Sequence, residues 1–331
     1  SGVEVTRETA LTYGPWWSGV TLLANDVGKL PLLTYRLAGA IKTRAPDLPS
    51  WRLLRRRPNE YQTAFDFKRQ LTGHAIGGGN GYAYVMRDGA ARPMELLPLD
   101  PGATTPVRVD GKLWYVLRVP GSNEDRKLPA DDVIHIKGFG FDGLMGYNVV
   151  QKARESVGLG LGQRKYASTY FKNNARPSVV LETPNKMKPE AVPVLRDMWN
   201  QMHAGLDNAH RTAVLDGGMT AKILSFSASD SQLIEAQQFT VRDVANFLRV
   251  PPHKLGDPTR TAYASLEQEN LAYLMEALDP WLIAWEEECY LKLLTEEEQA
   301  SESVLIEFHR QELLRADRGA MANYNRAALG G

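Results

Sequence analysis

Two adjacent prolines, Pro251 and Pro252, interrupt a helical pattern late in the chain and constrain its fold more than any other feature. Each proline fixes φ near −65° and removes a backbone donor, so no helix continues through them. The residue before a proline is pushed toward extended conformations, which makes Val250 a predicted helix end. A turn pattern follows at residues 256–258, and residues 265–268 have the capping-box pattern of a new helix. We therefore predict a stiff, exposed loop between two helices, of the kind that contacts a partner.

The first half of the sequence predicts an α+β fold with mainly antiparallel hairpins. Apolar residues recur at helical spacing over residues 9–28, and Thr63 is the predicted cap of a helix that runs to about Ala75. Asp88 and Gly89 form a strong hairpin signal. Runs rich in β-branched and aromatic residues predict strands at residues 32–37, 82–87, 94–99, 105–109, 113–118 and 132–138.

The second half is predicted to be mainly helical, with a compact insert. A helix from residue 147 to about 171 contains Gly158 and Gly162, which share one face. They indicate either a groove for close helix packing or a local kink. Pro280 is expected to kink or divide the longest helical run near Ala277. The insert is expected to hold a strand, a helix and a hairpin, and helices and a final strand complete the chain, at residues 178–181, 190–203, 212–226, 229–248, 265–294, 304–308 and 310–328.

The net charge is zero, but the charges are unevenly distributed. Residues 147–176 hold six basic side chains and one acidic, whereas residues 266–294 hold seven acidic and one basic. In a monomer these are two solvated helix faces; in a ring they would pair between subunits or line a pore. A protein that grips DNA needs a basic surplus. A conduit has the opposite requirement, because each phosphate contact hinders sliding, so a neutral chain is compatible with passing DNA.

No catalytic, metal or cofactor motif occurs in the sequence. The glycines of residues 77–81 lack a following Gly-Lys-Ser/Thr and precede a strand, so they predict a turn instead of a phosphate cradle. HExxH, CxxC and GxSxG are absent. His135 is interpreted as structural, Asp131 and Asp132 as the start of a strand, and Cys289, among glutamates, as unreactive. No run approaches the roughly 20 apolar residues of a membrane span.

Several blocks, in this order along the chain, resemble tailed-bacteriophage portal proteins of the Hong Kong phage type, or head–tail connectors. The likeness extends from about residue 9 to about residue 318. The blocks in the first part of the chain are residues 30–32 (LPL), 57–59 (RPN), 79–83 (GNGYA), 95–99 (ELLPL), 132–136 (DVIHI) and 174–177 (NARP). Those in the later part are residues 229–239 (SDSQLIEAQQF), 250–256 (VPPHKLG) and 267–270 (EQEN).

The resemblance implies a portal-type fold with an α/β wing, a helical stem, a small α/β clip and a long tunnel helix. The implied parts are residues 1–145, wing; 146–176, first stem helix; 177–228, clip; 229–248, second stem helix; 249–264, tunnel loop; 265–309, tunnel helix and return to the wing; and 310–331, start of a crown.

The resemblance also implies a function without catalysis. Copies of the chain, twelve in this family, would form a ring at one capsid vertex, assembled in the host bacterial cytoplasm and carried in the virion. Double-stranded DNA would enter and leave through the ring without sequence specificity. The terminase large subunit, the head–tail adaptor and the major capsid protein or scaffold would be partners, with no membrane involved. No cofactor is implied.

Particular residues inherit roles from this resemblance. The tunnel loop would face DNA through Pro251, Pro252, His253, Lys254, Thr259 and Arg260. Gly158 and Gly162 would allow close packing between subunits, and Trp199, Asp216 and Gly217 of the clip would contact the motor or adaptor. Two other classes stay open: a phage-encoded nucleic-acid-processing enzyme, which would need a cluster of acids, histidines or a nucleophile, and a monomeric interaction module, which particle size would distinguish from a ring.

Overall fold

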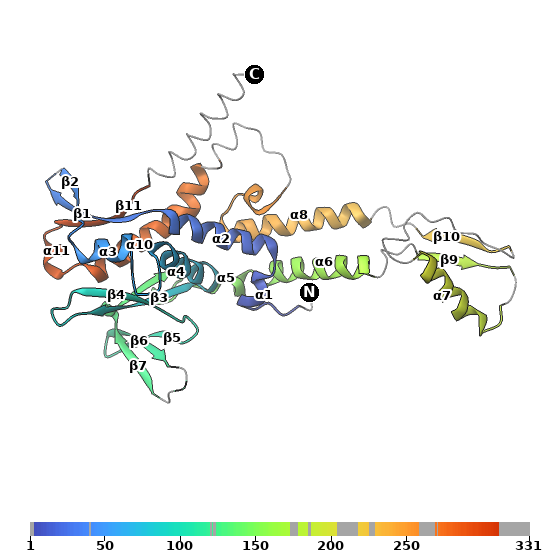
Figure 1. Ribbon diagram of the computed structural model, residues 1–331, viewed down its shortest axis with the longest axis horizontal. Helices are drawn as coiled ribbons and strands as arrows, with labels where there is room; N and C mark the ends of the chain where they lie inside the picture. Colours follow the sequence, from blue (N-terminus) through green and yellow to red (C-terminus); the bar gives the residue numbers. More distant parts are fainter. Residues whose placement is uncertain are drawn as a thin grey trace, which may run out of the picture. The chain divides into compact units, whose positions relative to one another are not determined.

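The computed structural model describes residues 3–39, 41–119, 121, 124–172, 178–184, 187–203, 218–224, 229–257, 269 and 271–310. The chain divides into two compact units. The larger contains residues 4–157 and 241–331, and the smaller contains residues 1–3 and 158–240. Both mix helices and strands, as the sequence predicts (Figure 1).

The larger unit combines helices with three small sheets. Its helical segments are α1 (Arg7–Leu11), α2 (Gly14–Lys29), α3 (Pro49–Arg55), α4 (Ala64–Gly78), α5 (Val149–Lys152), α10 (Asp279–Leu293) and α11 (Glu296–Ala300). Short 3₁₀ turns span Ala130–Asp132 and Pro252–Leu255, and a π-helical segment spans Tyr273–Leu278. Its strands are β1 (Leu32–Ala38), β2 (Ile41–Arg44), β3 (Asn80–Arg87), β4 (Pro93–Leu99), β5 (Thr104–Val109), β6 (Lys112–Arg118), β7 (Asp125–Pro129), β8 (Val133–Lys137) and β11 (Val304–Phe308).

All described strand pairs are antiparallel, as predicted. The three sheets of the larger unit have the orders β11-β1-β2, β4-β3-β8 and β5-β6-β7. β1 joins an early and a late segment of the chain, because Leu32 lies opposite Phe308 and Arg36 opposite Val304 of β11. The predicted hairpin at Asp88 joins β3 to β4. The sequence did not indicate β2 and β7, which are short and largely exposed.

The core of the larger unit lies where α2 packs along α4, with α10 beside them (Figure 1). Trp16 and Leu23 of α2 and Phe67 of α4 are almost completely buried. Trp285 of α10 meets Phe67 edge to face, with ring centroids 5.8 Å apart. Its indole Nε1 donates to Thr72 Oγ1 at 2.9 Å, so the polar atom of this buried ring is satisfied.

Helix boundaries follow the predicted caps with three differences. Thr63 accepts from the Asp66 amide, as predicted, but α4 continues through Gly78, and only Gly79, with φ 86°, ends it in the left-handed region. The helix expected from residue 147 is divided at Ala153 into α5 and α6. The helical run is not divided near Ala277: it is π-helical over residues 273–278 and continues directly into α10.

The smaller unit contains the outer parts of two long helices and a small α/β element. Helix α6 (Arg154–Lys172) enters it from the larger unit, and α8 (Ser229–Leu248) returns. Between them lie β9 (Ser178–Glu182), α7 (Ala191–His203) and β10 (Thr220–Leu224), and β10 pairs with β9. The strand predicted at 212–215, the cap at 265–268 and the helix at 311–328 fall outside the described residues.

Candidate functional site

The loop after α8 begins where the prolines predict, and most of its described residues are half-buried or buried instead of exposed as predicted. Helix α8 ends at Leu248, and Arg249 has a left-handed φ of 54°. After Pro251, residues 252–255 form a 3₁₀ turn. Gly256, with φ 91°, closes this turn as its amide donates to the His253 carbonyl. Glycine adopts a positive φ without strain, so Gly256 allows the backbone to change direction at the end of the turn.

Two leucines anchor this turn to α2. Leu248 and Leu255 are each 6% exposed and lie against Gly19. A methyl group built on Gly19 would overlap Leu248 Cδ1 and approach Leu255 Cδ2 to 3.3 Å. Because Gly19 has no side chain, the start of the loop can pack directly onto α2.

Two of the three cations predicted to face DNA, His253 and Lys254, contact other residues of the chain. His253 Nδ1 lies 2.6 Å from Glu269 Oε2, a charge contact without the geometry of a hydrogen bond, and it is an ion pair when the imidazole is protonated. Lys254 Nζ lies 5.2 Å from the ring centroid of Tyr273, a cation–π contact. Both side chains are half-buried. Thr259 and Arg260 are outside the described residues.

Further contacts stabilise the same region. Tyr273 donates its hydroxyl hydrogen to Asp26 Oδ2 of α2 at 2.8 Å, and both groups are buried. Arg242 of α8 pairs with the buried Asp257 at 2.9 Å, just after the turn. The residues up to Asp257 are therefore held in place by specific polar contacts.

Three carboxylates of the acidic stretch have partners inside the larger unit. Glu286 and Asp279 both pair with Arg310 at 2.6 Å. Glu288 accepts from the His135 amide at 3.2 Å, and burial raises the pKa of its carboxyl group. Much of the acidity of α10 therefore stabilises the fold, which favours the structural interpretation of this helix over a channel lining.

The two stem glycines lie on α6, where this helix runs beside α8. Gly158 is buried within the single chain and Gly162 is half-buried. Thr240 of α8 donates to Gln163 of α6 at 3.2 Å. Because Gly158 is already covered by its own chain, it is a better candidate for packing within the subunit than between subunits.

The clip residues are only partly described. Trp199 lies on α7 and is half-buried, whereas Asp216 and Gly217 fall outside the described residues. Three apolar side chains of α7 are more than half exposed: Val192, Val194 and Met198. Val194 and Met198 are one helical turn apart, so they share a face.

An exposed aromatic cluster occurs on the loop between β8 and α5, where the sequence analysis indicated no site. Phe139 is 73% exposed and Phe141 81% exposed, and both stack edge to face or tilted with Tyr147. Beside it lies a cavity of about 370 Å³, lined in part by Phe139, Val149, Phe247, Pro280 and Trp281. The alternation of glycine and phenylalanine over residues 138–141 was the available signal.

A buried asparagine holds this aromatic loop in place. Asn80 Oδ1 accepts from the Gly146 amide at 2.8 Å, and its Nδ2 donates to the Gly146 carbonyl at 3.0 Å. This pairing fixes the amide orientation, so His135 Nε2, 2.9 Å from Oδ1, carries the proton and Tyr115 donates to Nδ1 at 3.0 Å. Burial lowers the pKa of His135 to about 3, consistent with this neutral tautomer and with its predicted structural role.

No catalytic or metal centre is apparent in the part of the chain that the structure describes. Within it, no three His, Cys, Asp or Glu side chains are close enough together to hold a metal ion. Cys289 is fully buried, and burial raises the pKa of its thiol. The same residues include no helix with the length and apolarity of a membrane span.

Comparisons with known proteins agree on one family. The model of the phage portal protein family matches residues 16–331. The chain is 29% identical over 328 residues to the portal protein of Enterobacteria phage HK97, covering 98% of this chain and 76% of that protein. It is 31% identical over 293 residues to the probable portal protein of Streptomyces phage phiC31, covering 85% of this chain and 64% of that protein.

Solved structures show the same fold. A protein in the virion of a native gene transfer agent particle superposes with a TM-score of 0.72 at 23% identity, covering 98% of this chain and 88% of that one. An HK97-family phage portal protein from Corynebacterium diphtheriae gives a TM-score of 0.62 at 17% identity, covering 95% of this chain and 99% of that one.

Proposed function

Because the chain belongs to the phage portal protein family, we propose that its copies close into a ring, a dodecamer on the family pattern, at one vertex of the capsid. Double-stranded DNA is packaged and ejected through this ring. The terminase large subunit and the head–tail adaptor dock on it, and the major capsid protein or scaffold surrounds it. The ring carries no catalytic activity of its own.

The family assignment confirms the coarser predictions: the portal role, the place in a phage virion and the mixed helix-and-sheet portal fold. The portal family is structural, which agrees with the prediction that the chain is not an enzyme. The chain spans 64% to 76% of the two curated relatives, so the ring, the DNA path and the docking partners stand here as proposals.

The observation that best supports a ring is the exposed aromatic cluster of Phe139, Phe141 and Tyr147. Large exposed apolar patches mark interaction surfaces, and aromatic residues are enriched at interface centres. The cavity beside the cluster is bordered by Phe247 and Trp281. We propose that the next subunit covers this face and removes these rings from water.

The ring is tested by negative-stain electron microscopy and mass photometry of the purified chain and of Phe141→Ser. We expect rings with a central hole for the native chain and mainly free subunits for the variant. Tyr61→Ser is the matched control, because Tyr61 is 69% exposed and lies elsewhere on the chain. Rings from Phe141→Ser at native yield would exclude the aromatic cluster as a subunit contact. Only monomers from the native chain would favour the interaction-module alternative or a need for partners.

The DNA path is proposed to run along the loop that follows α8. Pro251 and Pro252 set its direction, and Lys254 and Arg260 supply its charge. Since the Tyr273 ring restrains Lys254, we expect it to guide DNA without a tight grip. The double variant Lys254→Ala and Arg260→Ala should assemble normally but alter packaging or DNA retention in particles.

A matched pair of exposed arginines outside this loop, Arg108→Ala with Arg118→Ala, controls for the lost charge in that experiment. Both arginines lie on the β5-β6 hairpin. Normal packaging by the loop variant, or an equal defect in the control, would remove the loop from the mechanism.

Motor or adaptor docking is proposed for the clip, through Trp199, Asp216 and Gly217 and the exposed face of α7. Val194 and Met198 provide an apolar surface there. The double variant Val194→Ser and Met198→Ser should lose terminase or adaptor binding in a pull-down while rings still form. Retained binding by intact variant rings would place the docking surface elsewhere.

A further inference from the structure

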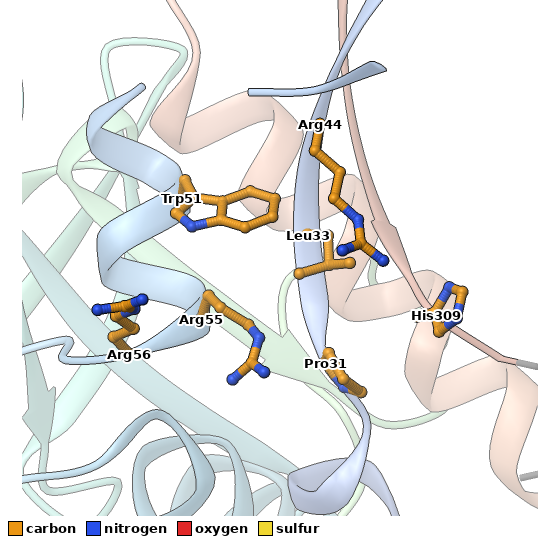
Figure 2. Close-up of a pocket in the computed structure, with 7 residues that line it drawn as sticks. All are labelled: Pro31, Leu33, Arg44, Trp51, Arg55, Arg56 and His309. Atoms are coloured by element: carbon orange, nitrogen blue, oxygen red, sulfur yellow. The ribbon is translucent and has the colours of Figure 1, made fainter. Parts of the chain in front are cut away.

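A cationic pocket lies in the larger unit between α3 and the β11-β1-β2 sheet. Its volume is about 430 Å³, and it is lined by Pro31, Leu33, Arg44, Trp51, Arg55, Arg56 and His309. Figure 2 shows the guanidinium groups of Arg44, from the strand side, and Arg55, from the helix side, extending toward the space beside the Trp51 ring. None of the proposed ring, DNA or docking contacts uses these residues.

The arginines of this pocket differ from the neighbouring arginines in that their side chains have no partner among the described residues. Arg36 forms a two-pronged ion pair with Asp47. Arg52 donates to the Met94 carbonyl, and Arg57 to backbone carbonyls of residues 59 and 60. By contrast, the guanidinium groups of the pocket residues Arg44, Arg55 and Arg56 form no hydrogen bond or ion pair with any residue that the structure describes, and no carboxylate lines the cavity.

A buried lysine near the pocket adds to the uncompensated positive charge. Lys68 is 3% exposed, donates to the Leu30 carbonyl and lies 5.3 Å from the ring centroid of Phe308. Burial, together with the charge on Arg55, lowers the pKa of its ammonium group to about 7. An anion bound at Arg55 would relieve this repulsion, so the fold favours a negative ligand at this position.

We propose that this pocket binds a cluster of carboxylates on an acidic peptide segment of a partner protein. Guanidinium groups form two parallel hydrogen bonds with carboxylates, and three of them meet at one cavity. Pro31 and Leu33 offer an apolar floor to an aliphatic side chain between the acidic ones.

Nucleic acid fits this pocket less well. Duplex binding relies on many phosphate contacts along an extended basic track, whereas this charge is concentrated in one cavity on a chain of zero net charge. The pocket therefore favours carboxylates.

The test is fluorescence anisotropy of a fluorescein-labelled peptide, Asp-Glu-Leu-Glu-Asp-Glu, titrated with the full chain at low and moderate salt. Arg44→Ala with Arg55→Ala should weaken binding at least about tenfold, as expected when charge-assisted hydrogen bonds are lost. The matched control, Arg108→Ala with Arg118→Ala, removes the same charge from the β5-β6 hairpin and should bind as the native chain does.

Equal weakening by both double variants would mean attraction by net charge alone and would overturn the proposal. Stronger competition by an oligonucleotide than by unlabelled peptide at equal charge would overturn the choice of a peptide ligand. Thermal melting confirms that the variants are folded. If the pocket double variant has a lower melting temperature than the native chain, Arg44→Gln, on the exposed strand β2, is compared with the native chain instead. Native peptide affinity in Arg44→Gln would also count against the pocket.

Discussion

Replacement of Asn80 by alanine should be among the most damaging single changes at the base of the aromatic loop. The native amide satisfies three buried polar groups: the Gly146 amide, the Gly146 carbonyl and the His135 ring. Asn80 is 5% exposed, so water does not readily replace it. An unsatisfied buried group costs about 1–3 kcal/mol, which gives a loss of about 3 kcal/mol or more in unfolding free energy.

Relaxation around the site has little room to reduce this cost. Gly146 lies so close to the chain that a methyl group on it would overlap the Gly79 carbonyl oxygen. Gly138 donates its amide hydrogen to the same oxygen at 2.8 Å. The loop is therefore held by close backbone contacts that cannot shift without breaking another hydrogen bond, and Asn80→Ala should also release Phe141 from its position.

Urea denaturation at low protein concentration measures the loss, with the slope checked for two-state behaviour because assembly would otherwise contribute. Asn148→Ala is the control, since Asn148 only caps α5 by accepting from the Gln151 amide. Loss of such a cap costs about 1 kcal/mol. Hydrogen exchange should accelerate at residues 138–147 in Asn80→Ala alone. Equal stability losses in the two variants, or unchanged exchange, would refute this reasoning.

Three further predictions concern the core and the loop. Gly19→Ala should destabilise the subunit by up to about 2 kcal/mol in thermal melts, because overpacking against Leu248 and Leu255 exceeds the gain in helix propensity. In the same melts Gly73→Ala should stabilise the subunit, because the added methyl group makes only an ordinary van der Waals contact. Tyr273→Phe leaves Asp26 without its buried hydroxyl donor and should cost about 1.5–3 kcal/mol in urea denaturation. Below pH 6.5 His135 becomes protonated in the unfolded chain but stays neutral in the folded chain, where its pKa is about 3. The unfolding free energy should therefore fall by up to about 1.4 kcal/mol per pH unit as the pH is lowered toward 3. His135→Gln should flatten this pH dependence.

Local signals predicted the elements well and their partners poorly. The strand at residues 304–308 was predicted with its observed bounds. This strand pairs with β1, with Leu32 opposite Phe308, although the two lie some 270 residues apart in the sequence. No local sequence signal predicts such a pairing. β2 and β7 were missed because their exposed, charged sequences lack the alternation that a half-buried strand shows.

The candidate site divides in the same way. Proline and glycine chemistry was sufficient to predict the turn after α8, because these residues restrict φ directly. It did not indicate that His253 lies beside Glu269 or Lys254 beside Tyr273, since those contacts require the next helical segment to fold back. Thr259 and Arg260 remain predictions from the family resemblance.

The π-helical segment Tyr273–Leu278 determines the angular phase between two parts of one helical run. An α-helix advances about 100° and 1.5 Å per residue, whereas a π turn contains an additional residue. Deleting one residue there would restore α-helical winding and rotate the preceding turn by about 100° relative to α10. Glu269 would then leave His253, and the side chains that precede the segment would face a different direction. This short segment thus determines which side chains of the residues before it face His253.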